Sequence, residues 1–75
     1  MRAPRKFQPE RLRHLMDENA VSGYQLEKFL GKAGVRVARS TVLSHANGDR
    51  DPRSSTVGAY ASFFNVPVDY FYSEL

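Results

Sequence analysis

The sequence predicts an all-α, compact domain of five short helices. Apolar residues recur three and four positions apart in separate stretches, which is the spacing of a buried helix face. Ser22 and Gln25 form a helix-start pattern, and no stretch alternates as a half-buried strand does. With 75 residues and no cysteine, the chain has room for one small core and excludes disulfides and thiolate metal sites.

Residues 1–8 are expected to form a flexible basic arm, because Arg2, Arg5 and Lys6 stand among prolines with little to bury. The helical domain should then occupy residues 9–75. Its first helix is expected from Pro9 to about Asn19, since proline suits the first helical turn. The buried stripe of this helix is Leu12, Leu15 and Met16.

The second helix has the clearest start in the chain. Ser22 and Gln25 form a capping box, and Val21 and Leu26 stand at the positions of a hydrophobic staple. Gly31 or Gly34 should end it. Its buried face is Leu26, Phe29 and Leu30.

The third helix is expected from Arg39 or Ser40 to Asn47, because Gly48 suits the left-handed position after a helix end. Ser54 or Ser55 should cap a fourth helix that runs to about Phe64, where Asn65 ends it. A fifth, short helix should begin at Pro67. The core positions of these three helices are Val42, Val57, Tyr60, Ala61, Phe64 and Phe71.

The charge of the chain is unevenly distributed. Residues 1–53 hold all 11 basic residues and six acidic ones, whereas residues 54–75 hold two acidic residues and no basic one. A basic face on the first two thirds suits a polyanionic partner, and ordinary solubilising charge is the alternative. The longest uncharged run, residues 54–68, is too short and polar to span a bilayer, and no signal-peptide core follows the N-terminus. We therefore expect a cytoplasmic, nucleoid-associated protein that makes no membrane contact.

Taken in order, these segments resemble the lambda-repressor-like helix-turn-helix family, also called the Cro/repressor or xenobiotic-response-element type. The resemblance covers residues 10–71. It rests on Arg11-Leu12-Arg13 with Leu15, Ser22 through Leu30, Arg39-Ser40-Thr41-Val42, Asn47-Gly48, Arg50, Pro52, Ala61, Phe64-Asn65-Val66 and Asp69. It implies a helix-turn-helix formed by the second and third helices, with the third in a DNA major groove.

Two departures from the family pattern stand out. Residues 31–38 lengthen the turn between the second and third helices, which resembles an actinobacterial branch of the family. Many relatives also join the first and third helices through a buried arginine–glutamate pair, where this chain has Met16 and Ala46. The absence of both charges together is physically consistent, because one buried charge without its partner would destabilise the fold. We therefore predict that Met16 packs near Ala46.

The resemblance assigns DNA base reading to the third helix, through Arg39, Ser40, Thr41, Leu43 and Ser44. Arg39 alone has a strong base signature, for guanine, and a phosphate contact or a solvated helix start is its alternative. The alternative for Ser40 is a helix N-cap. DNA phosphate contacts are expected from Ser22, Gly23, Tyr24, Lys32, Arg36, Asn47, Arg50 and Arg53. Arg50 can instead pair with Asp49 or Asp51.

His45 stands where relatives keep an aliphatic core residue, so we expect a partly buried, hydrogen-bonded histidine. With His14 as the only other histidine and no cysteine, no metal site is expected, and no cofactor. The C-terminal aromatic residues exceed what so small a core can hold. We expect a homodimer contact, or a surface for a further protein partner, from Phe63, Tyr70, Tyr72 and Leu75.

The leading functional hypothesis is a sequence-specific, double-stranded DNA-binding transcriptional regulator of the repressor type, acting as a homodimer. One alternative is a protein-interaction module, such as an antitoxin or adaptor, on the same fold. The other is a non-specific, nucleoid-associated DNA binder. An enzyme is not expected, because the chain has neither a G-x-S-x-G motif nor phosphate-loop spacing around Gly31-Lys32.

Overall fold

Four α-helices and one 3-10 helix make up the fold in the computed structural model, which describes residues 6–72. The α-helices are α1 (Pro9–Glu18), α2 (Gly23–Lys32), α3 (Arg39–Asn47) and α4 (Ser54–Phe64), and the 3-10 helix is η1 (Val68–Phe71). No strand occurs within residues 6–72. The prediction of an all-helical fold is confirmed, but the expected fifth α-helix is a short 3-10 helix.

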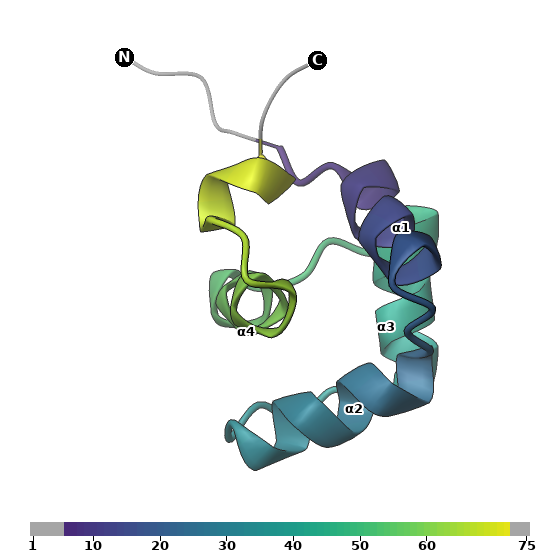
Figure 1. Cartoon of the computed structure of the whole chain (residues 1–75), viewed down its shortest axis with the longest axis vertical. Coiled ribbons are helices and arrows are strands. Elements are labelled where there is room, and N and C mark those ends of the chain that lie inside the picture. The colour runs from purple at the N-terminus through teal and green to yellow at the C-terminus, as the bar shows by residue number, and fades with distance from the viewer. Residues whose placement is uncertain (1–5, 73–75) are drawn as a thin grey trace.

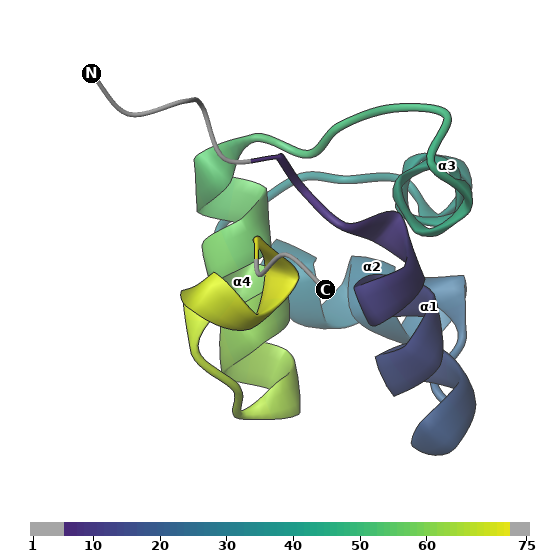
Figure 2. The same ribbon diagram turned by 90° about the horizontal axis from the view of Figure 1, so that it is seen from above.

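The helices enclose a single core, and the Cα atoms of the chain have a radius of gyration of 11.6 Å. α3 packs on α1 and α2, α4 packs on α2 and η1, and η1 also packs on α1. In Figure 1, α4 is seen end-on beside the α1–α3 pair, with α2 running beneath; in Figure 2, α3 lies at the far edge from α4. The fully buried side chains at the centre are Leu12, Leu26, Leu30, Val42, Val57, Tyr60 and Phe71.

The predicted core positions are confirmed in most cases. Met16 and Ala46 are both buried and line the same hollow between α1 and α3, as their shared loss of charge suggested. Leu15, Phe29 and Phe64 lie at the edge of the core and are half-buried.

Phe7 and Gln8 belong to the fold and not to the flexible arm that we predicted for residues 1–8. The Phe7 side chain is buried and stacks on Phe71, with 5.8 Å between ring centroids. The Gln8 backbone N–H donates to the Phe71 carbonyl at 2.8 Å. The sequence pattern did not indicate this, because a lone aromatic residue among prolines has no periodicity. Arg2 and Arg5 lie outside the described residues.

The helix starts agree only in part with the predicted caps. The capping box of α2 is present: the Gln25 N–H donates to Ser22 Oγ, and the Ser22 N–H donates to Gln25 Oε1. In contrast, α3 begins after Ala38, so Ser40 is not its cap, and α4 begins after Arg53, so neither Ser54 nor Ser55 caps it. Neither α3 nor α4 has a side-chain cap for the free N–H groups of its first turn.

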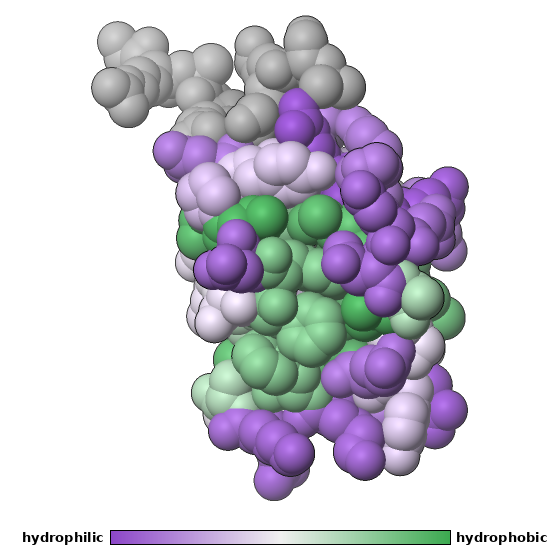
Figure 3. Space-filling model, in the orientation of Figure 1, coloured by the Kyte–Doolittle hydropathy of each residue, from purple (hydrophilic) through white to green (hydrophobic). Residues whose placement is uncertain are grey.

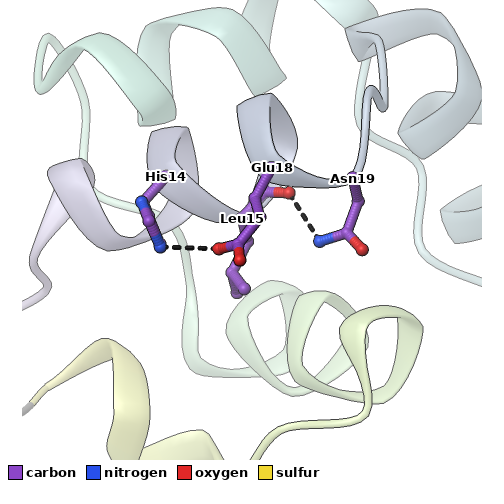
Figure 4. A network of polar contacts seen from close by, with 4 residues as sticks. All are labelled: His14, Leu15, Glu18 and Asn19. Atoms are coloured by element: carbon purple, nitrogen blue, oxygen red, sulfur yellow. Dashed lines mark hydrogen bonds and ion pairs between the residues drawn. The ribbon is translucent and has the colours of Figure 1, made fainter.

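Every α-helix ends in the same left-handed turn. The residues with positive φ are Ala20, Gly34, Gly48 and Asn65. The residue after each of them donates its N–H back into the last turn, from Val21 to Met16, Val35 to Leu30, Asp49 to Ser44 and Val66 to Ala61. This arrangement satisfies carbonyl groups that a helix end leaves free, and the three valines then pack against the core. α1 gains one further bond, because the Asn19 side chain donates to the Leu15 carbonyl, beside the His14–Glu18 pair (Figure 4).

Ala20 holds a conformation that suits glycine, with φ at +54°. We predict that Ala20→Gly raises the free energy of unfolding by about 1 kcal/mol, because it removes a Cβ penalty of that order. The matched control is Ala33→Gly, since Ala33 caps α2 at a φ of −84° and should lose stability on substitution. Urea denaturation of both variants measures the effect, and an equal change in the two would contradict it.

Candidate nucleic-acid interface

α3 turns one side to the core and leaves the other open. Val42, His45 and Ala46 are buried. At about 100° per residue, the exposed and half-exposed positions on the opposite side are contiguous. We call this side the α3 ridge; its residues are Arg39, Ser40, Leu43, Ser44 and Asn47. Four of the five predicted base-reading residues lie on it, and Leu43 is 47% exposed, which is unusual for leucine.

Thr41, the fifth predicted base-reading residue, lies at the flank of the ridge. It is half-buried and shares a hollow with His45 on the side of α3 away from α1. Two hollows of about 500 Å³ therefore border the ridge, one on each side.

The first hollow, which we call the tyrosine hollow, lies between α3, α1 and the start of α2. Among its lining residues are Arg13, Ser22, Tyr24, Arg39, Leu43 and Asn47. The Arg13 guanidinium donates to the side-chain oxygen of Asn47, which joins α1 to the end of α3. Five of these six residues are predicted DNA contacts, and the sixth, Arg13, is one that the sequence analysis did not select.

Tyr24 stands between two cations in the tyrosine hollow and is 48% exposed. Lys28 Nζ lies 5.3 Å and Arg39 Cζ 5.2 Å from its ring centroid. Arg39 Nε also lies 4.0 Å from Glu27 Oε1. Cation–π contact and the nearby carboxylate hold the Arg39 side chain along α2, at the edge of the ridge. The helical spacing of Tyr24, Glu27 and Lys28 was the available signal for this group.

The second hollow, which we call the arginine hollow, lies between the 33–38 connection and the loop from α3 to α4. Three predicted phosphate contacts, Arg36, Arg50 and Arg53, line it. Asp51 contributes the opposing charge, and Thr41, Ser55 and Thr56 add hydroxyl groups. The hollow is therefore basic and rich in hydrogen-bond donors, which suits an anion.

His45 and Tyr60 form a buried hydrogen bond between α3 and α4, with 2.8 Å between Nδ1 and the hydroxyl oxygen. His45 is 4% exposed and lines the arginine hollow from within. Burial lowers the pKa of His45, the charge of Arg50 lowers it further, and Asp51 opposes the shift. Burial likewise raises the pKa of Tyr60. The expectation of a hydrogen-bonded core histidine is confirmed.

The remaining predicted phosphate contacts differ in their availability. The Ser22 hydroxyl accepts the capping bond, and Gly23 lies buried beneath α3. Lys32 is exposed at the end of α2 and lines neither hollow. The structure therefore brings Arg36, Arg50 and Arg53 together in the arginine hollow, and Tyr24 and Asn47 together in the tyrosine hollow. Lys32 lies apart from both groups.

Phe63, Tyr70 and Tyr72, three of the predicted dimer contacts, are half-buried. Phe63 packs edge-on to Phe29, and Tyr70 stacks under Arg11, whose Cζ lies 4.9 Å from the ring. Tyr72 meets Phe7 edge-on at 6.3 Å. Leu75 lies outside the described residues. An apolar area nonetheless crosses the middle of the molecular face drawn in Figure 3, over α4 and between polar margins.

No three histidine, aspartate or glutamate side chains within residues 6–72 gather as metal ligands would. No helix in the same range is long and apolar enough to cross a membrane.

Comparison with protein-family models, with curated proteins and with solved structures gave no match.

Gly23 permits the close approach of α2 to the start of α3. A Cβ at this position would lie 3.3 Å from the Arg39 carbonyl oxygen and 3.4 Å from Leu43 Cγ. We predict that Gly23→Ala lowers the free energy of unfolding by about 1 kcal/mol, because the α3 backbone must shift. Gly31→Ala is the control, since nothing lies within 4 Å of its Cβ, and should raise the same quantity by up to about 1 kcal/mol. Stabilisation of both variants in thermal denaturation would contradict the close packing.

The burial of His45, which lowers its pKa, predicts a stability that falls in mild acid. The unfolded chain takes up a proton on this histidine near pH 6.5, whereas the folded chain resists protonation. Stability is therefore complete above pH 6.5 and is lost as the pH falls towards the lowered folded pKa, by up to about 1.4 kcal/mol per unit. Urea denaturation between pH 7.5 and 5.5 should show this loss, and His45→Gln should flatten it. An unchanged slope in His45→Gln would assign the loss to other groups.

Proposed function

We propose that the chain binds double-stranded DNA as a helix-turn-helix regulator, with α2 and α3 as the two helices and α3 in the major groove. One observation carries the proposal: the α3 ridge is polar and narrow, and a hollow with basic side chains borders it on each side. A major groove about 12 Å wide admits one α-helix and is bounded by two phosphate backbones. A ridge between two basic hollows is complementary to that shape.

Each hollow would face one DNA strand. Arg13, Tyr24 and Asn47 in the tyrosine hollow offer donors to one backbone, and the first-turn N–H groups of α2 favour an anion. Arg36, Arg50 and Arg53 in the arginine hollow offer donors to the other. Such contacts fix the register of the protein on the duplex and carry no sequence information.

Sequence reading would fall to the ridge. Arg39 is suited to a bidentate contact with guanine, and its placement against Tyr24 and Glu27 lowers the entropy that such a contact costs. The Ser40 and Ser44 hydroxyls can donate to phosphates and can donate to or accept from bases, and the exposed Leu43 suits a thymine methyl group. A single strong base contact gives modest specificity per copy, so a homodimer on an inverted repeat fits this set.

The arrangement of the helices supports the resemblance of the sequence to the lambda-repressor-like family. α2 begins at the capping box, α3 follows it after residues 33–38, and α3 packs against both α2 and α1. In the homodimer that we propose, contacts would come from the half-buried aromatic residues Phe63, Tyr70 and Tyr72, with Leu75 beyond the described part of the chain.

A protein-interaction module is the second candidate, and one observation favours it. Tyr24 and Leu43 are two of the most exposed large apolar side chains in residues 6–72, and both line the tyrosine hollow. Exposed apolar groups around a hollow also suit a protein partner. The two candidates differ in salt dependence, since each neutralised DNA phosphate contributes about −0.9 to the log–log slope.

We predict that selection from a random duplex pool enriches an inverted repeat, and that Arg39→Ala relaxes one base position with a loss of about 1–3 kcal/mol there. Arg50→Ala should instead weaken binding to all duplexes and reduce the salt slope by about 0.9. Arg11→Ala is the control for lost charge, because Arg11 lies over Tyr70 and lines neither hollow beside α3. Fluorescence anisotropy at two or more salt concentrations gives both quantities.

The same titrations separate the alternatives. Salt-steep binding without an enriched sequence would indicate a non-specific nucleoid-associated binder. No binding at low salt would overturn DNA recognition and leave the protein-interaction module. Unchanged base preference in Arg39→Ala would remove Arg39 from the reading set.

A further inference from the structure

The arginine hollow extends inward to a buried floor. A DNA phosphate bound at the rim of the hollow would not contact this floor. The hollow has a volume of about 510 Å³, within the range of small-molecule sites. Arg36, Arg50 and Arg53 give it three positive charges against the one negative charge of Asp51. The valines of the 33–38 connection, Val35 and Val37, form an apolar part of its wall.

The floor holds a histidine nitrogen that has no hydrogen-bond partner among residues 6–72. His45 is 4% exposed, and its hydrogen bond to Tyr60 uses Nδ1 only. No buried side-chain nitrogen or oxygen among the described residues lacks a partner, so Nε2 of His45 must reach open space. The open space that this side chain lines is the arginine hollow.

The partner of Nδ1 decides what Nε2 offers. The Tyr60 hydroxyl is fully buried, and His45 is the one acceptor that residues 6–72 give it. A buried hydroxyl that donates its proton to Nδ1 leaves the ring proton of a neutral histidine on Nε2. The floor of the hollow therefore presents an N–H donor.

Further donors surround the same space. Thr56 is 5% exposed and lines the hollow without a hydrogen bond to a described residue, so its hydroxyl also faces open space. Ser55 and Thr56 lie in the first turn of α4, which has no side-chain cap, and its free N–H groups favour an anion. The donors thus come from α3, from α4 and from the two connections that flank α3, and they converge on one basic space.

We propose that the arginine hollow binds a small phosphorylated molecule with at least two negative charges, and that this ligand competes with DNA for Arg36, Arg50 and Arg53. The phosphoryl oxygens accept from the arginines, from Thr56 and from His45 Nε2, and the rest of the molecule packs on Val35 and Val37. Binding itself stands without DNA, whereas the competition rests on the proposed function.

Inorganic pyrophosphate is the probe, measured by calorimetry and by NMR of the full chain at constant ionic strength, with sulfate for comparison. We expect Arg53→Gln to weaken pyrophosphate binding about tenfold or more, because it removes charge-assisted bonds. Lys28→Gln is the matched control, since it removes the same charge beside the other hollow, and should bind as the wild type does. Pyrophosphate should shift the Nε2 resonance of His45 and the amide resonance of Thr56.

Thr56→Val tests the floor separately from the rim. It keeps the shape of the side chain and removes the hydroxyl, so pyrophosphate binding should weaken while Thr56→Ser retains it. Circular dichroism establishes that each variant is folded. The proposed site would be overturned if Arg53→Gln and Lys28→Gln weakened pyrophosphate binding equally, or if pyrophosphate did not shift the resonances of His45 and Thr56. Pyrophosphate would then bind only through diffuse surface charge.

A further measurement with duplex DNA tests the ligand proposal separately from the proposed function. If pyrophosphate binds with the local shifts and raises the DNA dissociation constant, both stand. If pyrophosphate binds with the local shifts but DNA does not bind, the ligand site stands and the proposed function fails. If duplex DNA shifts His45 and Thr56 while pyrophosphate does not, the hollow holds a backbone phosphate and the ligand proposal fails alone.

Discussion

The buried hydrogen bond between His45 and Tyr60 is the polar contact that joins α3 to α4. The backbones of α3 and α4 pack mainly on other elements, α3 on α1 and α2, and α4 on α2 and η1. Two long polar side chains therefore span the distance between α3 and α4, and both are buried. A buried polar pair is stable only when each group satisfies the other, so the bond sets the rotation of α3 about its axis. That rotation places the α3 ridge outward and His45 Nε2 towards the arginine hollow.

The turns after the helices complete this arrangement. Each α-helix ends in a left-handed residue, and in three of the four cases a valine follows and returns the chain to the core. Chain direction is thereby set locally, with little need for long connections. Ala20 shows that tertiary packing can hold a residue in a conformation that its own type disfavours. The same turn around Gly34 starts the connection that forms one wall of the arginine hollow.

The fold brings together basic residues that are distant in sequence. Arg13 and Arg39 reach the tyrosine hollow from α1 and α3, and Arg36, Arg50 and Arg53 reach the arginine hollow from two different loops. Neither group is a charge run in sequence. Their common feature is that each lies beside α3, where an anion would meet several donors at once. An anion held by convergent donors is bound more strongly than one that meets scattered surface charges.

The sequence by itself determined the order of the four α-helices, most of the core, the capping box of Ser22 and Gln25 and the turn at Gly48, because these depend on local spacing and local backbone preference. The fifth helix that it predicted is a 3-10 helix. The sequence also selected Leu43 as a DNA contact and predicted a hydrogen-bonded His45. Only the tertiary structure decided the burial of Phe7, the positive φ of Ala20 and the partnership of Arg13 with Asn47. Each of these depends on a contact with a distant residue or on tertiary packing, which the spacing of apolar residues along the chain does not reveal. The two hollows are of the same kind: their residues come from segments far apart in the chain, and only packing brings them together.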